Sequence, residues 1–357
     1  ANLCEGDTLA LQRGQTKVAC NCRTERTYNS AAAAILGDGS VVTWGYADIG
    51  GDSRAVECQL RDVQHIQSSQ KAFAAIVADG SVVTWGFPNN GGDSSAVQGQ
   101  LMNVRHIQSS ERAFAAVLAD GSVVAWGDGD YGGDSSAVQD QLVNVQHIQS
   151  SSHAFAAVLA DGSVVAWGHA DFGGDCSAVH GQLVNVRHIQ SSKRAFAAIL
   201  ADGSVVAWGH GGYGGNCRAV QGQLVNVQHI LSSSRAFAAI LDDGFVVAWG
   251  HGGYGGNCRA VQGQLRNVQH LQSSFAAFAA ILADGSVVSW GKPKHGGDSS
   301  AVQGQLVNVQ HIQSSSRAFA AILDDGSVVT WGNIWDGGDS SGVQGQLRNG
   351  PPVPANV

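Results

Sequence analysis

Charged side chains are scarce in this sequence, and no positive surplus exists among them. The 357 residues include 20 Lys and Arg against 28 Asp and Glu, which gives a formal net charge of −8. A chain that binds nucleic acid usually carries a basic surplus that neutralises phosphate groups. The composition therefore predicts that nucleic acid is not a partner.

Long apolar runs are also absent, since no stretch approaches the roughly 18 apolar residues typical of a membrane-spanning helix. No charged segment followed by an apolar stretch indicates a signal peptide. The chain starts at Ala1, and its single methionine is Met102, which predicts a processed or trimmed amino terminus. We expect no membrane span, and the compartment stays open.

The seven cysteines are too sparse and too irregular to form a disulfide framework. Cys4, Cys20, Cys22 and Cys58 lie in a divergent first repeat, and Cys58 stands where later repeats carry Gly. In an oxidising compartment Cys58 could pair with one of the other three. The sequence leaves open whether any of these four forms a disulfide.

What the sequence has in abundance is repetition. The pair Trp44-Gly45 recurs every 41 residues without an insertion, so that eight near-copies of one unit fill almost the whole chain. A fixed period of this length indicates a solenoid, a propeller or an array. Residues shared by all copies are therefore expected to be framework. The recurring tryptophans are Trp44, Trp85, Trp126, Trp167, Trp208, Trp249, Trp290 and Trp331.

One repeat predicts three short strands, at residues 186–190, 195–200 and 204–208. Asp202-Gly203 separates the second from the third, and an Asp-Gly pair between two apolar runs is a strong signal for a hairpin with a type I′ turn. The second strand is apolar on both faces, which requires cover on both sides. No helical pattern lies between the strands, so we expect neighbouring sheets to supply that cover.

The rest of each repeat is a loop with a Gly-Gly pair and a stretch such as Ser-Ala-Val-Gln-Gly-Gln-Leu, which is either an outer fourth strand or a connector. A degenerate first strand near 18–22 and an end just after 346–347 predict one blade built from both termini. The prolines in 350–357 cannot continue a strand ladder. We expect an N-terminal extension at 1–16, a closed all-β propeller at 17–349 and a Pro-rich tail at 350–357. Eight short blades of three to four strands are predicted, with seven as the alternative.

The segment 195–209, Ala-Phe-Ala-Ala-Ile-Leu-Ala-Asp-Gly-Ser-Val-Val-Ala-Trp-Gly, resembles the repeat of the regulator of chromosome condensation family. The 41-residue period is closer to the related propellers that inhibit β-lactamases. The resemblance spans about residues 17–349 and implies a β-propeller. It does not imply one function, because such propellers serve as exchange factors, inhibitors, light receptors and adaptors.

Two windows differ between the repeats: the four residues after Trp-Gly, called window 1, and the pair before Ala-Phe, called window 2. In a propeller, equivalent loops gather on one face, where variable aromatic and basic side chains build a binding surface. Drift in exposed loops after duplication is the alternative explanation. The candidate partner-binding residues are Trp335, Phe275, Phe172, Tyr131, Tyr213, Tyr254, Tyr46, Phe87, Lys71, Arg112, Arg194, Arg235 and Arg317.

Metal and catalytic sites are not predicted. Seven histidines share one position in seven repeats, and we expect a structural hydrogen-bonding role for them, because a wide circle does not bring several ligands to one ion. His169, His210 and His251 recur seven residues before Cys176, Cys217 and Cys258, and whether these sets bind a metal stays open. No nucleophile elbow or phosphate-binding loop is present. The seven histidines are His65, His106, His147, His188, His229, His270 and His311.

These observations predict a protein-binding module, an adaptor or inhibitor without enzymatic activity or cofactor, whose protein partner the sequence does not identify. One alternative is a structural subunit of a larger assembly. Another is a small-ligand binder or enzyme that uses the central channel. Exposed aromatic side chains on the loops would favour the first hypothesis.

Overall fold

The computed structural model describes residues 8–11, 16–21 and 30–347. Two compact units are distinguished, and each is described by itself. The N-terminal unit comprises the described residues of Leu3–Ala198 and Trp208–His210, and the C-terminal unit those of Ile199–Ala207 and Gly211–Val357.

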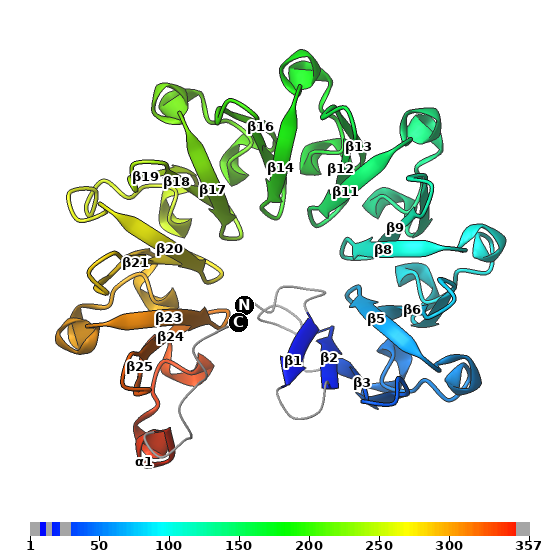
Figure 1. The fold of residues 1–357 in the computed structure, drawn as a ribbon, viewed down its shortest axis with the longest axis horizontal. Coiled ribbons are helices and arrows are strands. Elements are labelled where there is room, and N and C mark those ends of the chain that lie inside the picture. Colours follow the sequence, from blue (N-terminus) through cyan, green and yellow to red (C-terminus); the bar gives the residue numbers. More distant parts are fainter. Residues whose placement is uncertain (1–7, 12–15, 22–29, 348–357) are drawn as a thin grey trace. The chain divides into compact units, whose positions relative to one another are not determined.

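The described strands form eight antiparallel sheets, and seven of these have three strands in the order in which the chain runs. The three predicted strands per repeat are confirmed, and eight repeated sheets fit an all-β propeller. Within the N-terminal unit, β5, β8 and β11 lie side by side (Figure 1). The first strands are β5 (Val63–Ser68), β8 (Val104–Ser109), β11 (Val145–Ser150), β14 (Val186–Ser191), β17 (Val227–Ser232), β20 (Val268–Ser273) and β23 (Val309–Ser314); the second are β6 (Ala72–Val77), β9 (Ala113–Leu118), β12 (Ala154–Leu159), β15 (Ala195–Leu200), β18 (Ala236–Leu241), β21 (Ala277–Leu282) and β24 (Ala318–Leu323); the third are β7 (Val82–Gly86), β10 (Val123–Gly127), β13 (Val164–Gly168), β16 (Val205–Gly209), β19 (Val246–Gly250), β22 (Val287–Gly291) and β25 (Val328–Gly332).

The first sheet has four strands, β1 (Thr8–Leu11), β2 (Thr16–Cys20), β3 (Ala31–Ile35) and β4 (Val41–Gly45). The degenerate strand expected near 18–22 is β2, and β1 lies within the residues assigned to the N-terminal extension. Every described sheet takes its strands from one continuous stretch of chain, so no described sheet joins strands from the two ends. Closure of a ring therefore stays a prediction.

The Asp-Gly pair makes the predicted hairpin but not the predicted turn. In the turn between β12 and β13, Gly162 has a φ of +77°, whereas the φ of Asp161 is not positive. The Gly162 N–H donates to the Leu159 carbonyl at 2.9 Å, and the Asp161 carboxylate accepts from the Ser163 N–H at 2.9 Å. A type I turn followed by a left-handed glycine fits this pattern. The type I′ expectation is wrong because the Asp side chain caps the turn from a right-handed backbone.

The Ser-Ala-Val-Gln stretch is a connector and not a fourth strand, since it forms short 3₁₀ turns. Window 1 forms a second set of such turns, each followed by a glycine of positive φ. The connector turns are η2 (Glu57–Gln59), η4 (Gln98–Gln100), η6 (Ser136–Gln141), η8 (Ser177–Gln182), η10 (Arg218–Gln223), η13 (Ser300–Gln305) and η15 (Ser341–Val343), before α1 (Gln344–Leu347); the window 1 turns are η1 (Ala47–Ile49), η3 (Pro88–Asn90), η5 (Gly129–Tyr131), η7 (Ala170–Phe172), η9 (Gly211–Tyr213), η11 (Gly252–Tyr254), η12 (Pro293–His295) and η14 (Ile334–Asp336).

The hydrophobic core lies between neighbouring sheets, as the two-sided apolar strand predicts. In the N-terminal unit, Ala113 and Ala115 of β9 form one cluster with Phe155 of β12 and Trp167 of β13. Small side chains on one sheet therefore face large ones on the next. Phe155 is fully buried, and burial of such a side chain stabilises the fold by about 1.5–3 kcal/mol.

Each buried tryptophan is also fixed by a hydrogen bond. The Trp126 indole N–H donates to the Gly91 carbonyl of the preceding repeat at 3.0 Å, and its ring stacks on Phe114 with centroids 5.3 Å apart. Trp44 is the exception: it is 49% exposed. The described residues offer its indole no hydrogen-bond acceptor.

Candidate partner-binding face

The two variable windows of a repeat lie next to each other. The Asp128 N–H, which begins window 1, donates to the carbonyl of Arg112 in window 2 at 3.0 Å. Window 2 also links successive repeats, because the Glu111 N–H donates to the Ser152 carbonyl at 3.0 Å. The two windows of this repeat therefore lie at the same edge of its sheet. We call the residues of the two windows the loop row.

A serine holds each loop in place. The Ser151 hydroxyl donates to the Phe172 carbonyl at 2.8 Å, and the Ser233 hydroxyl donates to the Tyr254 carbonyl at 2.7 Å. In the last repeat the Ser315 hydroxyl donates to the Asp336 carbonyl at 2.6 Å. These bonds give a hydrogen-bond donor to the last carbonyl of each 3₁₀ turn, which would otherwise have none. The backbone of the loop row is therefore fixed.

In the N-terminal unit the loop row alternates basic and aromatic side chains. Arg112 lies over the Tyr131 ring at 4.5 Å from its centroid. The centroid of the His153 ring lies 3.8 Å from the ring centroids of both Tyr131 and Phe172. Arg194 lies over the Phe172 ring, 4.3 Å from its centroid. Such contacts between a cation and an aromatic ring contribute about 0.5–1 kcal/mol each at exposed sites. Lys71 makes a looser contact of this kind, 5.2 Å from Phe87.

The C-terminal unit repeats this arrangement. Arg235 lies between two rings, 4.8 Å from Tyr213 and 4.7 Å from Tyr254. Phe275 continues the series, 6.0 Å from Tyr254 and 5.9 Å from His295. The candidate residues of this unit therefore contact and stabilise one another.

Exposure distinguishes the candidates. Trp335 is 89% exposed and its neighbour Ile334 60%, whereas Phe172 is only 8% exposed. Tyr46 and Phe87 are intermediate between these extremes, at 49% and 39%. Ile334 did not appear among the sequence candidates, although it shares window 1 with Trp335.

Arg317 is half-buried in the last repeat, where its carbonyl accepts from the Asn333 N–H at 2.9 Å. Asn333 in turn caps the loop, because its side chain accepts from the Trp335 N–H at 2.8 Å. The exposed tryptophan therefore stands on a backbone that is fixed at both ends of its turn.

One carboxylate in the loop row is partly buried. Glu111 lies 3.7 Å from the His153 Nε2. Burial alone would raise the pKa of Glu111, but hydrogen bonds to His153 and Ser152 outweigh it and hold this pKa below its usual value. The contact contributes to fixing His153 between its two aromatic neighbours.

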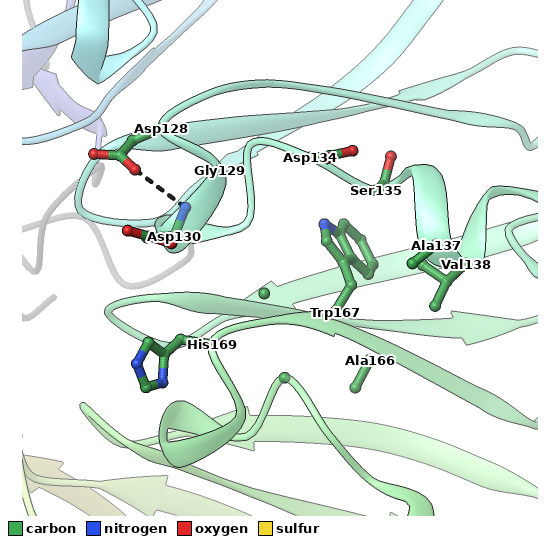
Figure 2. Close-up of a pocket in the computed structure, with 12 residues that line it drawn as sticks. Asp128, Gly129, Asp130, Asp134, Ser135, Ala137, Val138, Ala166, Trp167 and His169 are labelled. Carbon is green, nitrogen blue, oxygen red and sulfur yellow. Dashed lines mark hydrogen bonds between the residues drawn. The ribbon is translucent and has the colours of Figure 1, made fainter.

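A groove of about 670 Å³ lies beside Trp167 in the N-terminal unit, lined by three aspartates and His169 (Figure 2). Asp128 accepts from the Asp130 N–H at 3.1 Å, and Asp134 accepts from the Ser136 N–H at 2.9 Å. These carboxylates therefore cap turns, and the backbone bond holds the pKa of Asp134 below its usual value.

The recurring His and Cys residues do not form a metal cluster. The Cys217 thiol is buried and donates to the Gln221 Oε1 at 3.0 Å, and burial raises its pKa. The His251 Nδ1 instead accepts from the Gly253 N–H. Within 8–11, 16–21 and 30–347 no three His, Cys, Asp or Glu side chains are grouped suitably for a metal ion. Cys58 is a free cysteine, while Cys4 and Cys22 lie outside the described residues.

Five of the seven equivalent histidines are not held by a hydrogen bond within the described residues, contrary to the expectation for the whole set: His106, His147, His229, His270 and His311. His106 and His147 are exposed, and neither ring has a hydrogen-bond partner in the described part of the chain. The reason is a bulge between the first two strands of the repeat, as in β11 and β12, where Val145 pairs with Leu159 but His147 pairs with Val158. The extra residue turns two consecutive side chains outward.

No helix in the described ranges has the length and apolar character to cross a membrane.

No family model and no curated protein matches this chain. Solved structures do match. The computationally designed Ika8 protein is 16% identical with a TM-score of 0.38, over 86% of this chain and 94% of that one. Prp20p from Saccharomyces cerevisiae, the yeast RCC1, is 15% identical with a TM-score of 0.40, over 67% and 74%. The ectodomain of the Physcomitrella patens receptor kinase CR4 is 14% identical with a TM-score of 0.41, over 76% and 72%. Yeast RCC1 is therefore one of the solved structures to which this chain is similar.

Proposed function

We propose that this chain is a non-enzymatic protein-binding module that engages its partner through the loop row. The observation that carries the proposal is the exposure of Trp335 at 89% and Ile334 at 60% on a loop with a capped backbone. Large apolar side chains on a rigid loop are the usual anchors of protein interfaces. The partner-binding set predicted from the sequence forms the remainder of this proposed surface.

The charges around this anchor favour an acidic partner surface. The windows of the last three repeats contain one acidic residue, Asp336, and four Lys or Arg residues, which are Arg235, Lys292, Lys294 and Arg317. Complementary charge speeds the encounter of two proteins and suppresses wrong partners. We therefore propose a partner that presents an apolar pocket bordered by Asp or Glu.

The test is capture with the double variant Trp335→Ala/Ile334→Ala. We expect a protein that co-purifies with the wild-type chain to be lost, or bound at least about tenfold more weakly, because truncating an anchor residue costs roughly 2 kcal/mol or more of binding free energy. Quantitative co-purification followed by titration of the identified partner measures the change.

The matched control is Val307→Ala, which removes an apolar side chain that is 54% exposed but lies outside the loop row. It should leave capture unchanged, and both variants should melt like the wild type. Equal capture by the double variant and the wild type would refute the role of the loop row.

We also propose that the first and last repeats pair and so close the propeller. In seven repeats the tryptophan N–H donates to a glycine carbonyl of the preceding repeat, such as Gly91 for Trp126. Trp44 lacks such a partner in the described residues, and Gly337 holds the same place in the last repeat. Hydroxyl-radical footprinting should then oxidise Trp44 as slowly as Trp126. Oxidation as fast as that of Trp335 would contradict closure.

A further inference from the structure

Two window 1 turns carry opposite charges at the same two positions. The turn of the third repeat contains Asp128 and Asp130, and the turn of the seventh repeat contains Lys292 and Lys294. Both form the same 3₁₀ turn, η5 and η12, which a glycine of positive φ ends. No other window 1 sequence holds two acidic or two basic residues. One backbone frame therefore presents a pair of carboxylates in one place and a pair of ammonium groups in another.

The carboxylates of the third repeat line the groove beside Trp167, which we call the acidic groove (Figure 2). None of the twelve described residues that line it is Lys or Arg. Arg112 reaches only Asp128, at 3.8 Å. Asp130 and Asp134 are exposed and form no ion pair with a described residue. A carboxylate accepts about four hydrogen bonds, so both retain acceptor capacity for a cation.

The lysines of the seventh repeat stand on a fixed turn. Pro293 begins this turn, and the Ser274 hydroxyl donates to the His295 carbonyl at its end, at 2.7 Å. Lys292 and Lys294 are exposed, and neither forms an ion pair with a described carboxylate. The η12 turn thus offers two positive charges that the described residues around it leave without a partner.

We propose that the partner of the loop row is a second copy of this chain, whose η12 turn docks into the acidic groove with Lys294 against the carboxylates. This rests on the proposed function, and it names the partner. Ala137, Val138 and Ala166 line the groove beside the aspartates, so it is an apolar surface bordered by Asp.

The size and chemistry of the groove suit a lysine side chain. Its volume of about 670 Å³ lies within the roughly 300–1,000 Å³ of pockets that hold a ligand. A lysine packs its aliphatic stem on apolar surface while its ammonium group reaches polar partners. Complementary charge across the contact would also favour one orientation of the two copies.

Exchanging the two charges tests this contact without a foreign residue in either turn. Asp130→Lys gives the third repeat the residue that the seventh carries at that position, and Lys294→Asp does the reverse. The cap of η5 is kept, because Asp128 provides it. The matched control is Asp48→Lys, which changes an exposed aspartate at the same position of η1, outside the acidic groove.

Sedimentation equilibrium of the full chain at about 0.1 M salt measures the association. The Debye length of about 10 Å screens repulsion between the net charges of two copies more than it screens a close ion pair. We expect the wild type and Asp48→Lys to associate equally as concentration rises. Asp130→Lys and Lys294→Asp alone should each associate at least about fivefold more weakly, because repulsion replaces an attraction. An equimolar mixture of these two should regain the wild-type affinity, since their charges are again complementary.

A wild-type chain that stays monomeric, or a mixture that associates no better than either variant alone, would overturn the inference. Thermal unfolding should be alike in all four proteins, so that weaker association reports the contact and not the fold. Capture of a different protein through Trp335 and Ile334 by a monomeric chain would leave the proposed function standing and overturn only the self-association.

Discussion

Replacing Trp126 by alanine should lower the free energy of unfolding by about 3–5 kcal/mol, the range for a buried tryptophan. Trp126 is only 4% exposed, stacks on Phe114 and donates its indole N–H to Gly91 of the preceding repeat. The substitution therefore removes apolar contact between two sheets and leaves a carbonyl without its donor. Urea unfolding followed by circular dichroism measures the loss.

Two companion variants divide this effect into its parts. Trp126→Phe keeps most of the apolar contact and removes the hydrogen bond, so it should cost about 1–2 kcal/mol, close to the value of one buried bond. Trp335→Ala removes a tryptophan that is 89% exposed and should cost almost nothing. A similar loss for Trp126→Ala and Trp335→Ala would mean that the packing between sheets does not stabilise the chain.

Gly132→Ala should destabilise the protein by about 3 kcal/mol or more, because it combines backbone strain with overpacking. Gly132 has φ of +89°, a region that residues with a side chain rarely adopt, and an added Cβ would stand 2.6 Å from Cδ2 of Phe155. Phe155 is fully buried, so its ring has no free space into which to move. The shift in the urea midpoint against wild type gives the measurement.

Gly181→Ala is the control for this glycine. Gly181 lies in a connector turn without positive φ, and an added Cβ would meet no atom within 4 Å. Alanine at such a position is expected to be neutral or to stabilise by about 0.4–1 kcal/mol, since it restricts the unfolded chain. If Gly132→Ala were as mild as this control, the loop would have to be free to move away from the Phe155 ring.

The strand pattern of the repeat could be predicted because it depends on local alternation and on the fixed period. Residues 186–190, 195–200 and 204–208 correspond to β14, β15 and β16 within one residue at their ends. The turn type could not be predicted, because the choice depends on whether the Asp161 carboxylate caps the Ser163 N–H. The connector was undecided for a similar reason: its residues suit a strand or a 3₁₀ turn equally well.

The contacts among the candidate partner-binding residues could not be predicted from the sequence. Variation between repeats identified Tyr131, Phe172 and Arg194. It could not reveal that His153 fills the space between two of these rings. The exposure of Ile334 could not be predicted from the sequence either, because apolar residues in a loop can be buried or exposed.

By itself the sequence determined the number of repeats, the three strands in each and the need for cover on both faces, because these follow from periodicity and side-chain polarity. Only the tertiary structure decided which side chains meet across repeats. The bulge that turns Gln146 and His147 outward and the exposure of Trp335 depend on neighbouring strands and loops, and no local pattern records that geometry.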